Sequence, residues 1–235
     1  MRPDGRAVDE LRRVTITKDY ARYPEGSVLM EMGDTRVLCN VTLDADLPPW
    51  LKGKGQGWVT AEYAMLPRST LVRTPRETRG FGARTQEIRR FIGRALRASV
   101  DLSLLGERNF TVDCDVIQAD GGTRTAAVTG GYIALALALR RLVQAGSVSA
   151  EVFLPAVAAV SVGLVDRVSL LDLCYAEDSG ADVDFNVALN AAGQFVEVQG
   201  TAESHPFSRE TLDQLLALAE KGVAKLLVFQ AEVLR

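Results

Sequence analysis

The sequence predicts an α+β fold, a mixed β-sheet with helices packed on it. Segments with the alternating or β-branched pattern of strands come in pairs between the helices, which disfavours the strict alternation of a doubly wound nucleotide fold. At 235 residues, with 47% hydrophobic and 24% charged, the chain can bury a full core. No Pro/Ser-rich linker or composition break divides it, so we expect residues 1–235 to form a single domain.

Nine segments have the strand pattern. In chain order they are RRVTITKDY, GSVLMEMG, TRVLCNVTL, GWVTAEYAML, NFTVDCDVIQAD, VAAVSVGLV, VSLLDLCY, VDFNVALN and QFVEVQG. Turn-forming pieces such as YPEG, MGDT and NAAGQ separate several of them. Helices are predicted over about 84–103, 123–145 and 208–233, the last opened by Ser208 as an N-cap.

The predicted helix 84–103 has an apolar face and a basic face. Its buried stripe has the i, i+3, i+4 spacing of Ile88, Phe91, Ile92, Ala95, Leu96 and Ser99. Arg84 projects roughly 40° from Ile88, on the core-facing side of the helix start. The opposite side is a solvated face, an RNA track or a subunit contact, formed by Arg90, Arg94 and Arg97.

Cysteine usage and the amino terminus indicate a cytoplasmic protein without a membrane partner. Cys39, Cys114 and Cys174 lie far apart in strand-like runs, with neither metal-ligand spacing nor a disulfide framework. The opening MRPDGRAVDELRR lacks the apolar core of a signal peptide, and no stretch approaches the length of uninterrupted apolar residues that a membrane span needs.

Charge is distributed very unevenly along the chain. The net charge is only −3, yet residues 52–97 contain eleven Lys/Arg and three Asp/Glu, so this segment carries +8 and the remainder −11. A basic block in an acidic protein suggests a local site for a polyanion. Within it lies an irregular arm that either contacts RNA phosphates or is disordered without a partner; its arginines are Arg68, Arg73, Arg76 and Arg79.

The stretch DGGTRT is the first candidate site. Arg124 lies in the first turn of the predicted helix 123–145, where the helix dipole favours anions. The glycines let backbone N–H groups approach a ligand, and Thr123 and Thr125 can donate from their hydroxyls, which suits a phosphate. The alternative is a glycine turn with a threonine cap. The Lys-Ser/Thr ending of a Walker loop is missing, and GKGQGW is not followed by a helix.

The acidic stretch YAEDSGADVDFN is the second candidate. Asp182 and Asp184 are two apart at a strand start and so point the same way, and Asp178 precedes them in a turn. Such carboxylates can hold a hydrated divalent cation or protonate a leaving oxygen; the alternative is a merely soluble hairpin turn. The single histidine, His205, is expected in a loop, and zinc or Ser-His-Asp chemistry has little support.

Together these features suit a reaction between two phosphates. Two unit charges about 5 Å apart repel by roughly 3 kcal/mol at an effective dielectric constant near 20. Arg84 and Arg124 could hold one anion while a metal on the aspartates offsets the charge of the other. This arrangement favours phosphorolysis over hydrolysis, since inorganic phosphate needs little general-base help.

Nearly the whole chain resembles the ribonuclease PH family, phosphate-dependent 3′-to-5′ exoribonucleases also called tRNA nucleotidyltransferases. Seven segments match in order: RPDGRAVDELRRVTI, GSVLMEMGDTRVLCNVTL, GWVTAEYAMLPRST, ARTQEIRRFIGRALRA, DCDVIQADGGTRTAAVTGGYIAL, YAEDSGADVDFNV and FVEVQGTAE. The resemblance implies a ribonuclease PH-type fold and the release of nucleoside diphosphates from an RNA shortened by one residue. It also implies Mg²⁺ or Mn²⁺ as cofactor and inorganic phosphate as co-substrate.

The resemblance also implies roles for single residues. It places phosphate binding on Arg84, Gly122, Thr123 and Arg124. It places catalysis on Asp178 and Asp184, with Asp182 beside them as a third metal contact. Asp184 or a metal-bound water would then protonate the departing 3′ oxygen. The family's tRNA-holding arm matches Arg68, Arg73, Arg76 and Arg79.

The implied partners are the 3′ ends of tRNA precursors, with other RNA such as ribosomal RNA left open, and further copies of the chain in a hexameric ring of three dimers. The arm is somewhat shorter than in many relatives, which puts the register of tRNA contacts in doubt, and Ala83 stands where a glycine is common. The alternative is a non-catalytic RNA-binding subunit of an exosome-like ring, although such a subunit has no need of all four active-site residues. A small-molecule phosphotransferase would need a nucleotide-triphosphate loop, which we do not find.

Overall fold

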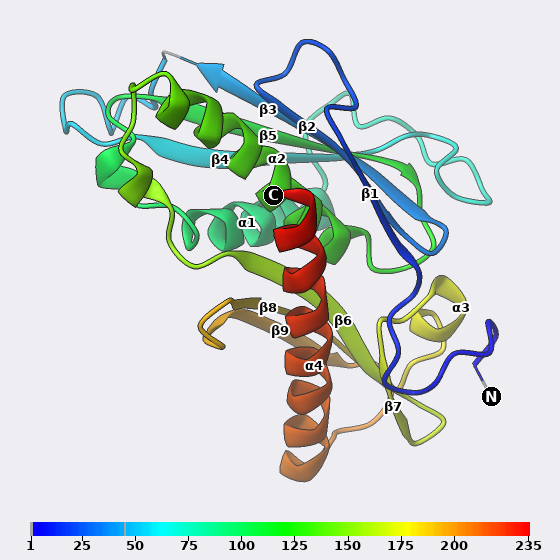
Figure 1. Cartoon of the computed structure of the whole chain (residues 1–235). Helices are drawn as coiled ribbons and strands as arrows, with labels where there is room; N and C mark the ends of the chain where they lie inside the picture. The colour runs from blue at the N-terminus through cyan, green and yellow to red at the C-terminus, as the bar shows by residue number, and fades with distance from the viewer. Residues whose placement is uncertain (1, 45) are drawn as a thin grey trace.

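The computed structural model describes residues 2–44 and 46–235, and these form two β-sheets with helices between and outside them (Figure 1). The nine strands are β1 (Val14–Lys18), β2 (Gly26–Met32), β3 (Thr35–Asp44), β4 (Trp58–Met65), β5 (Asn109–Gln118), β6 (Val157–Val165), β7 (Val168–Leu171), β8 (Val183–Asn190) and β9 (Phe195–Ala202). The helices are α1 (Ala83–Arg97), α2 (Thr123–Gln144), α3 (Tyr175–Asp178) and α4 (Arg209–Val233), with 3₁₀ turns η1 (Leu102–Leu104) and η2 (Ala150–Val152). The predicted α+β class and all nine strands are confirmed.

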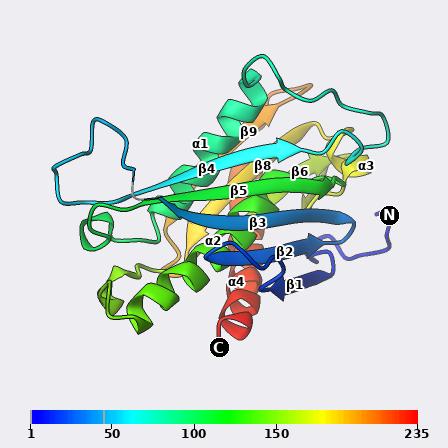
Figure 2. The same cartoon turned by 90° about the horizontal axis from the view of Figure 1, so that it is seen from above.

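The first sheet is mixed, as predicted. Its strand order is β1-β2-β3-β5-β4, visible side by side in Figure 2, and β4 runs parallel to β5 while the other neighbours are antiparallel. The second sheet has the order β7-β6-β8-β9 and is antiparallel throughout. Along β5 the side chains alternate, so that Phe110, Val112, Cys114 and Val116 are buried on the inner face.

Helix α2 lies between the two sheets and packs on both (Figure 1). By length and composition alone it could cross a membrane, but 72% of its most apolar window is buried inside the fold. A Cβ on Gly130 would lie 2.7 Å from Cβ of Met30, so the close approach of α2 to β2 requires a residue without a side chain. Helix α1 packs beside β4 and α2, and α4 covers β6 and β7.

Buried hydrophobic side chains from both sheets and from α1, α2 and α4 belong to one continuous cluster. That residues 1–235 form a single domain stays a prediction. What the cluster does establish is that the strands of the two halves are fixed against the same helix, α2.

Three sequence predictions need correction. The first helix ends at Arg97 rather than near 103, because Val100 pairs with Phe153 in an isolated β-bridge and Asp101 caps the 3₁₀ turn that follows. Arg97 is not on a solvated face: it is half-buried, donates to the carbonyl of Val59 at 2.9 Å and lies 4.5 Å from the ring centre of Trp58. Burial lowers its pKa.

The third correction concerns Cys174, which caps the short helix α3 instead of lying in a strand. The sequence predicts a turn at the acidic stretch and no helix there, but in the structure Asp178 is the last residue of the short helix α3. All three cysteines are free and buried.

Candidate active site

A cleft of about 630 Å³ opens where the start of α2 faces α3 and β8. The residues that line it come from segments next to both sheets, and these segments are far apart in the sequence. Among the residues that line it are the six central to the sequence prediction: Arg84, Gly122, Thr123, Arg124, Asp178 and Asp184. The structure therefore brings the proposed phosphate-binding and catalytic residues to one place.

The start of α2 presents backbone N–H groups to this cleft. Gly121 and Gly122 have φ angles of 73° and 63°, left-handed values that favour glycine, and Gly122 is the N-cap without a side chain to occupy the helix end. The hydroxyl of Thr123 is hydrogen-bonded to that of Tyr63 at 2.8 Å. The expectation that Thr125 donates to a ligand is not met: its hydroxyl is buried, donates to the carbonyl of Gly122 at 2.9 Å and does not line the cleft.

The two arginines of the cleft differ in their partners. Arg124 is bound by Glu87 of α1, with 3.0 Å between Nη1 and Oε2, and also donates to Oε1 of Gln199 at 3.1 Å. Arg84 is exposed and lines the cleft rather than packing into the core as its helical angle suggested. Within residues 2–44 and 46–235 it makes no ion pair, so its guanidinium is available to an anion.

Two of the three expected aspartates, Asp178 and Asp184, line the cleft with these arginines, and Glu203 lines it too. Burial raises the pKa of Asp178, while the charges of Arg84 and Arg124 oppose the rise. Burial also raises the pKa of Asp184, and the carboxylates of Asp178 and Glu203 raise it further. Both carboxyl groups therefore keep their proton to a higher pH than an ordinary aspartate does.

Asp182 does not join this pair. Its carboxylate accepts a 2.7 Å hydrogen bond from the hydroxyl of Ser204 and lies outside the cleft lining. In the part of the chain that the structure describes, no three His, Cys, Asp or Glu side chains form a metal-binding group. The expected trio is thus reduced to Asp178 and Asp184. This donor set still fits Mg²⁺, which proteins commonly bind through one or two carboxylates together with substrate phosphates.

The basic arm is exposed and irregular, as predicted. It spans the region between β4 and α1, and its arginines Arg68, Arg73, Arg76 and Arg79 are all exposed. Arg76 lines a cavity of about 340 Å³ beside Phe81 and Arg84, which joins the arm to the cleft. Of the basic face of α1, Arg90 is exposed and Arg94 pairs with Glu197 of β9. His205 is an exposed loop residue.

Sequence reasoning missed several polar residues of the cleft, chiefly Glu203, Asn186 and Ser161. One of them left a readable signal: Asn186 is two residues beyond Asp184 on β8, so strand alternation places both on the same face. Ser161 and Glu203 come from β6 and from the segment after β9, and only the pairing of these strands with β8 brings them near.

Comparison with known proteins identifies the family of this chain. Models of the 3′ exoribonuclease family match the chain twice, domain 1 over residues 10–140 and domain 2 over residues 156–222. The chain belongs to the 3′ exoribonuclease family. Within it, the chain is 57% identical to ribonuclease PH of Moorella thermoacetica, covering all of this chain and 94% of that protein.

Solved structures confirm the fold. The crystal structure of rice (Oryza sativa) Rrp46 superimposes with a TM-score of 0.80 at 16% identity, covering 100% of both chains. A chain of the Archaeoglobus fulgidus exosome with RNA bound to the active site gives a TM-score of 0.78 at 22% identity, covering 96% of this chain and 91% of that one. At these identities the likeness supports the fold alone.

Proposed function

We propose that this protein is a phosphorolytic 3′-to-5′ exoribonuclease that uses inorganic phosphate to remove nucleotides from RNA as nucleoside diphosphates. The observation that carries the proposal is one cleft with cations and helix N–H groups on one wall and two carboxylates of raised pKa on the other. The full-length similarity to a ribonuclease PH supports it.

Phosphate binding is assigned to Arg84, Arg124 and the backbone of Gly122 and Thr123. A helix N-terminus with a glycine cap offers N–H groups and a partial positive charge to an anion. Arg84 adds a free guanidinium, and Arg124 adds a second that is held in place by Glu87. These groups orient the anion and offset its repulsion from the RNA phosphate.

In the chemical step, an oxygen of inorganic phosphate attacks the phosphorus of the terminal phosphodiester. The new P–O bond joins the phosphate to the terminal nucleotide, and the bond from that phosphorus to the 3′ oxygen of the preceding nucleotide breaks. Asp184 donates its proton to this oxygen, a role that its raised pKa favours. The products are a nucleoside diphosphate and an RNA shortened by one residue with a 3′ hydroxyl.

The carboxylate of Asp178 and the unprotonated oxygen of Asp184 would hold Mg²⁺ or Mn²⁺. When bound there, the ion supplies positive charge that stabilises the phosphoryl oxygens. Asp178 would act from α3, whose start is tied to the loop before α2 by a hydrogen bond from the N–H of Tyr175 to the carboxylate of Asp120 at 3.1 Å. The half-buried carboxylate of Asp182 has a partner of its own in Ser204 and contributes least.

The RNA substrate is assigned to the 3′ ends of tRNA precursors, with the arm as the element that contacts the RNA backbone outside the cleft. Four exposed arginines without a fixed strand or helix can follow phosphates without reading bases. We assign the protein to a homo-oligomer, a hexameric ring of three dimers, and to the cytoplasm, where three buried free thiols are stable.

The test is to incubate the purified protein with Mg²⁺ and a tRNA carrying a short 3′ extension, with and without inorganic phosphate, and to identify the released nucleotides. Nucleoside diphosphates that appear only with phosphate are the expected result, and ³²P from labelled phosphate should be found in the β position. Monophosphates released regardless of phosphate would make the protein a hydrolase. Tight RNA binding without release would favour the non-catalytic subunit.

A further inference from the structure

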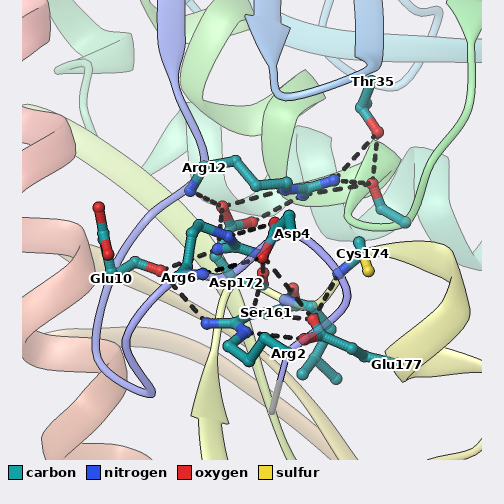
Figure 3. A network of polar contacts seen from close by, with 12 residues as sticks. Arg2, Asp4, Arg6, Glu10, Arg12, Thr35, Ser161, Asp172, Cys174 and Glu177 are labelled. Atoms are coloured by element: carbon teal, nitrogen blue, oxygen red, sulfur yellow. Dashed lines mark hydrogen bonds and ion pairs between the residues drawn. The ribbon is translucent and has the colours of Figure 1, made fainter.

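Behind the cleft lies a buried network of ion pairs and hydrogen bonds that the reaction itself does not use (Figure 3). It joins the segment before β1 to the two loops that carry the active-site residues. Its centre is the pair of Arg12 and Asp172, whose side chains are 3% and 0% exposed. A second pair, Arg2 and Glu177, is equally buried at 3% exposure for each side chain.

Arg12 and Asp172 form a bidentate ion pair. Nε lies 3.1 Å from Oδ2 and Nη2 lies 2.7 Å from Oδ1, and the backbone N–H of Arg12 also donates to Oδ2 at 2.8 Å. Asp172 has a left-handed φ of 55°, unusual for a residue with a side chain. The next residue, Leu173, is tied to the cleft by a 3.1 Å hydrogen bond from its N–H to Oγ of Ser161.

The same guanidinium reaches the loop that precedes α2. Arg12 donates to the carbonyls of Asp120 and Gly121, and the hydroxyl of Thr35 donates to the Gly121 carbonyl at 2.6 Å. Thr35 also accepts from the N–H of Asp120 at 3.0 Å. A Cβ on Gly122 would lie 2.8 Å from Nη2 of Arg12, so the loop is in van der Waals contact with the ion pair.

The network also fixes α3, the carrier of Asp178. Arg2 binds both oxygens of Glu177, the neighbour of Asp178, at 2.7 and 2.8 Å. The side chain of Asp120 accepts from the N–H of Tyr175 at 3.1 Å, at the start of α3. The loop before α2 and the helix with Asp178 are therefore tied to each other as well as to the network.

We propose that Arg12 and Thr35 are positioning residues of the phosphate site: they fix the Asp120–Gly121 backbone so that the N–H groups at the start of α2 face Asp178 across the cleft. Neither Arg12 nor Thr35 lines the cleft, so both act on the phosphate site through the backbone of Asp120 and Gly121. The proposal rests on the proposed function, since it assigns these residues to the phosphate of that reaction.

Physical reasoning favours a positioning role over a purely stabilising one. A buried ion pair is weak evidence for stability, because apolar residues of similar volume often serve as well. The contacts of the Arg12–Asp172 pair converge on the loop before α2 and the loop before α3, which carry the active-site residues. Small displacements of groups that orient a reactant reduce reaction rates strongly. Asp172, in one of these loops, is a left-handed residue other than glycine, and its conformation needs outside support.

The decisive variant is Thr35→Val, compared with Thr129→Val as a matched control. Both hydroxyls are fully buried, and each donates to one carbonyl and accepts from one backbone N–H: Thr35 with Gly121 and Asp120, Thr129 with Ala159 alone. Thr35 also accepts a longer hydrogen bond, 3.4 Å, from Nη1 of Arg12. Only the first pair of bonds leads to the phosphate loop. The two variants should therefore lose similar stability but differ in phosphate use.

The kinetic measurements are KM for inorganic phosphate, KM for RNA and kcat. Thermal unfolding is measured as well, together with the shift of the unfolding midpoint that inorganic phosphate alone causes. Thr35→Val should raise the phosphate KM about tenfold and reduce the phosphate-induced shift, with the RNA KM unchanged. Thr129→Val should leave all three constants within about twofold. Equal effects of the two variants on the phosphate KM, or none from Thr35→Val, would overturn the proposal.

Two further variants divide the network. Arg12→Lys keeps the charge but loses the bidentate grip, so it should raise the phosphate KM and lower kcat together. Arg2→Lys weakens the contacts to Glu177 and to the carbonyl of Asp172 but none to the loop before α2, so it should lower kcat with the phosphate KM unchanged. A wild-type protein that releases monophosphates would refute the proposed function itself, which separates that failure from a failure of the positioning proposal.

Discussion

Glu87 competes with phosphate for Arg124, and this makes Glu87→Gln an informative perturbation. In the structure Glu87 holds the guanidinium at 3.0 Å, and both residues line a cavity of about 610 Å³ together with Arg84 and Glu203. A phosphate bound to another edge of the same guanidinium would lie about 6 Å from the Glu87 carboxylate. Neutral glutamine removes this repulsion while it keeps a hydrogen-bonding oxygen for Arg124.

The size of the effect follows from Coulomb's law and from exposure. Two unit charges about 6 Å apart repel by about 3 kcal/mol at an effective dielectric constant of 20 and by about 0.7 kcal/mol in water. The side chain of Glu87 is 33% exposed, which places the repulsion near the lower value, about 1 kcal/mol. We therefore expect the phosphate KM to fall about fivefold.

The assay is initial-rate phosphorolysis of an extended tRNA over a range of phosphate concentrations, at fixed ionic strength. Glu62→Gln is the matched control, because Glu62 pairs with Arg89 of the same helix, is 35% exposed and lies outside the cleft lining. That control should leave the phosphate KM within about twofold. If Glu87→Gln raised the phosphate KM instead, Glu87 would serve to orient Arg124, and the competition argument would be refuted.

The remaining predictions concern the nucleophile, the acid and the arm. Arg124→Ala removes a charge-assisted contact worth about 1.5–3 kcal/mol, so the phosphate KM should rise at least about tenfold with the affinity for tRNA little changed in a binding assay. Asp184→Asn should bind RNA normally yet turn over at least about a hundredfold more slowly. The pKa of Asp184 is higher in the folded than in the unfolded protein, so its contribution to stability is present below the unfolded pKa and is lost as pH rises through the folded pKa. At pH 7 the ionised Asp184 therefore destabilises the fold, and Asp184→Asn should unfold at a higher temperature than wild type. This difference in unfolding temperature should disappear toward pH 4. Arg76→Gln should weaken RNA binding for all sequences alike and reduce the salt slope by about 0.7, and an unchanged slope would remove Arg76 from the RNA contact.

Local sequence pattern was sufficient for the elements and for part of the site. The alternation of buried and open positions in β5 and the β-branched run of β6 follow from period two, and α4 begins after Ser208 because its hydroxyl accepts from the N–H of Thr211 at 3.1 Å. The pair Arg84 and Arg124 was recognisable because each places a cation at a helix start, where cations are disfavoured.

What the sequence concealed depends on contacts between distant segments. The end of α1 is set by a β-bridge to Phe153, and Arg97 is drawn inward by Trp58, neither of which helical periodicity contains. Asp182 and Asp184 share a strand face, yet Ser204 holds Asp182 apart from the cleft. The role of Arg12 was invisible for the same reason, since Asp172 is 160 residues away.

The location of the cleft explains why both halves of the chain are needed for one reaction. Arg84 and Arg124, the residues proposed to bind phosphate, fall within the first family model, residues 10–140, and the carboxylates Asp178 and Asp184 fall within the second, residues 156–222. Each half supplies charge of one sign, so neither alone can bind an anion and protonate a leaving oxygen. We therefore expect the rate of the reaction to depend on how the two halves are placed relative to each other. Besides α2, which packs on both sheets, the buried pairs made by Arg2 and Arg12 tie the start of the chain to the second half at the point where the cleft opens.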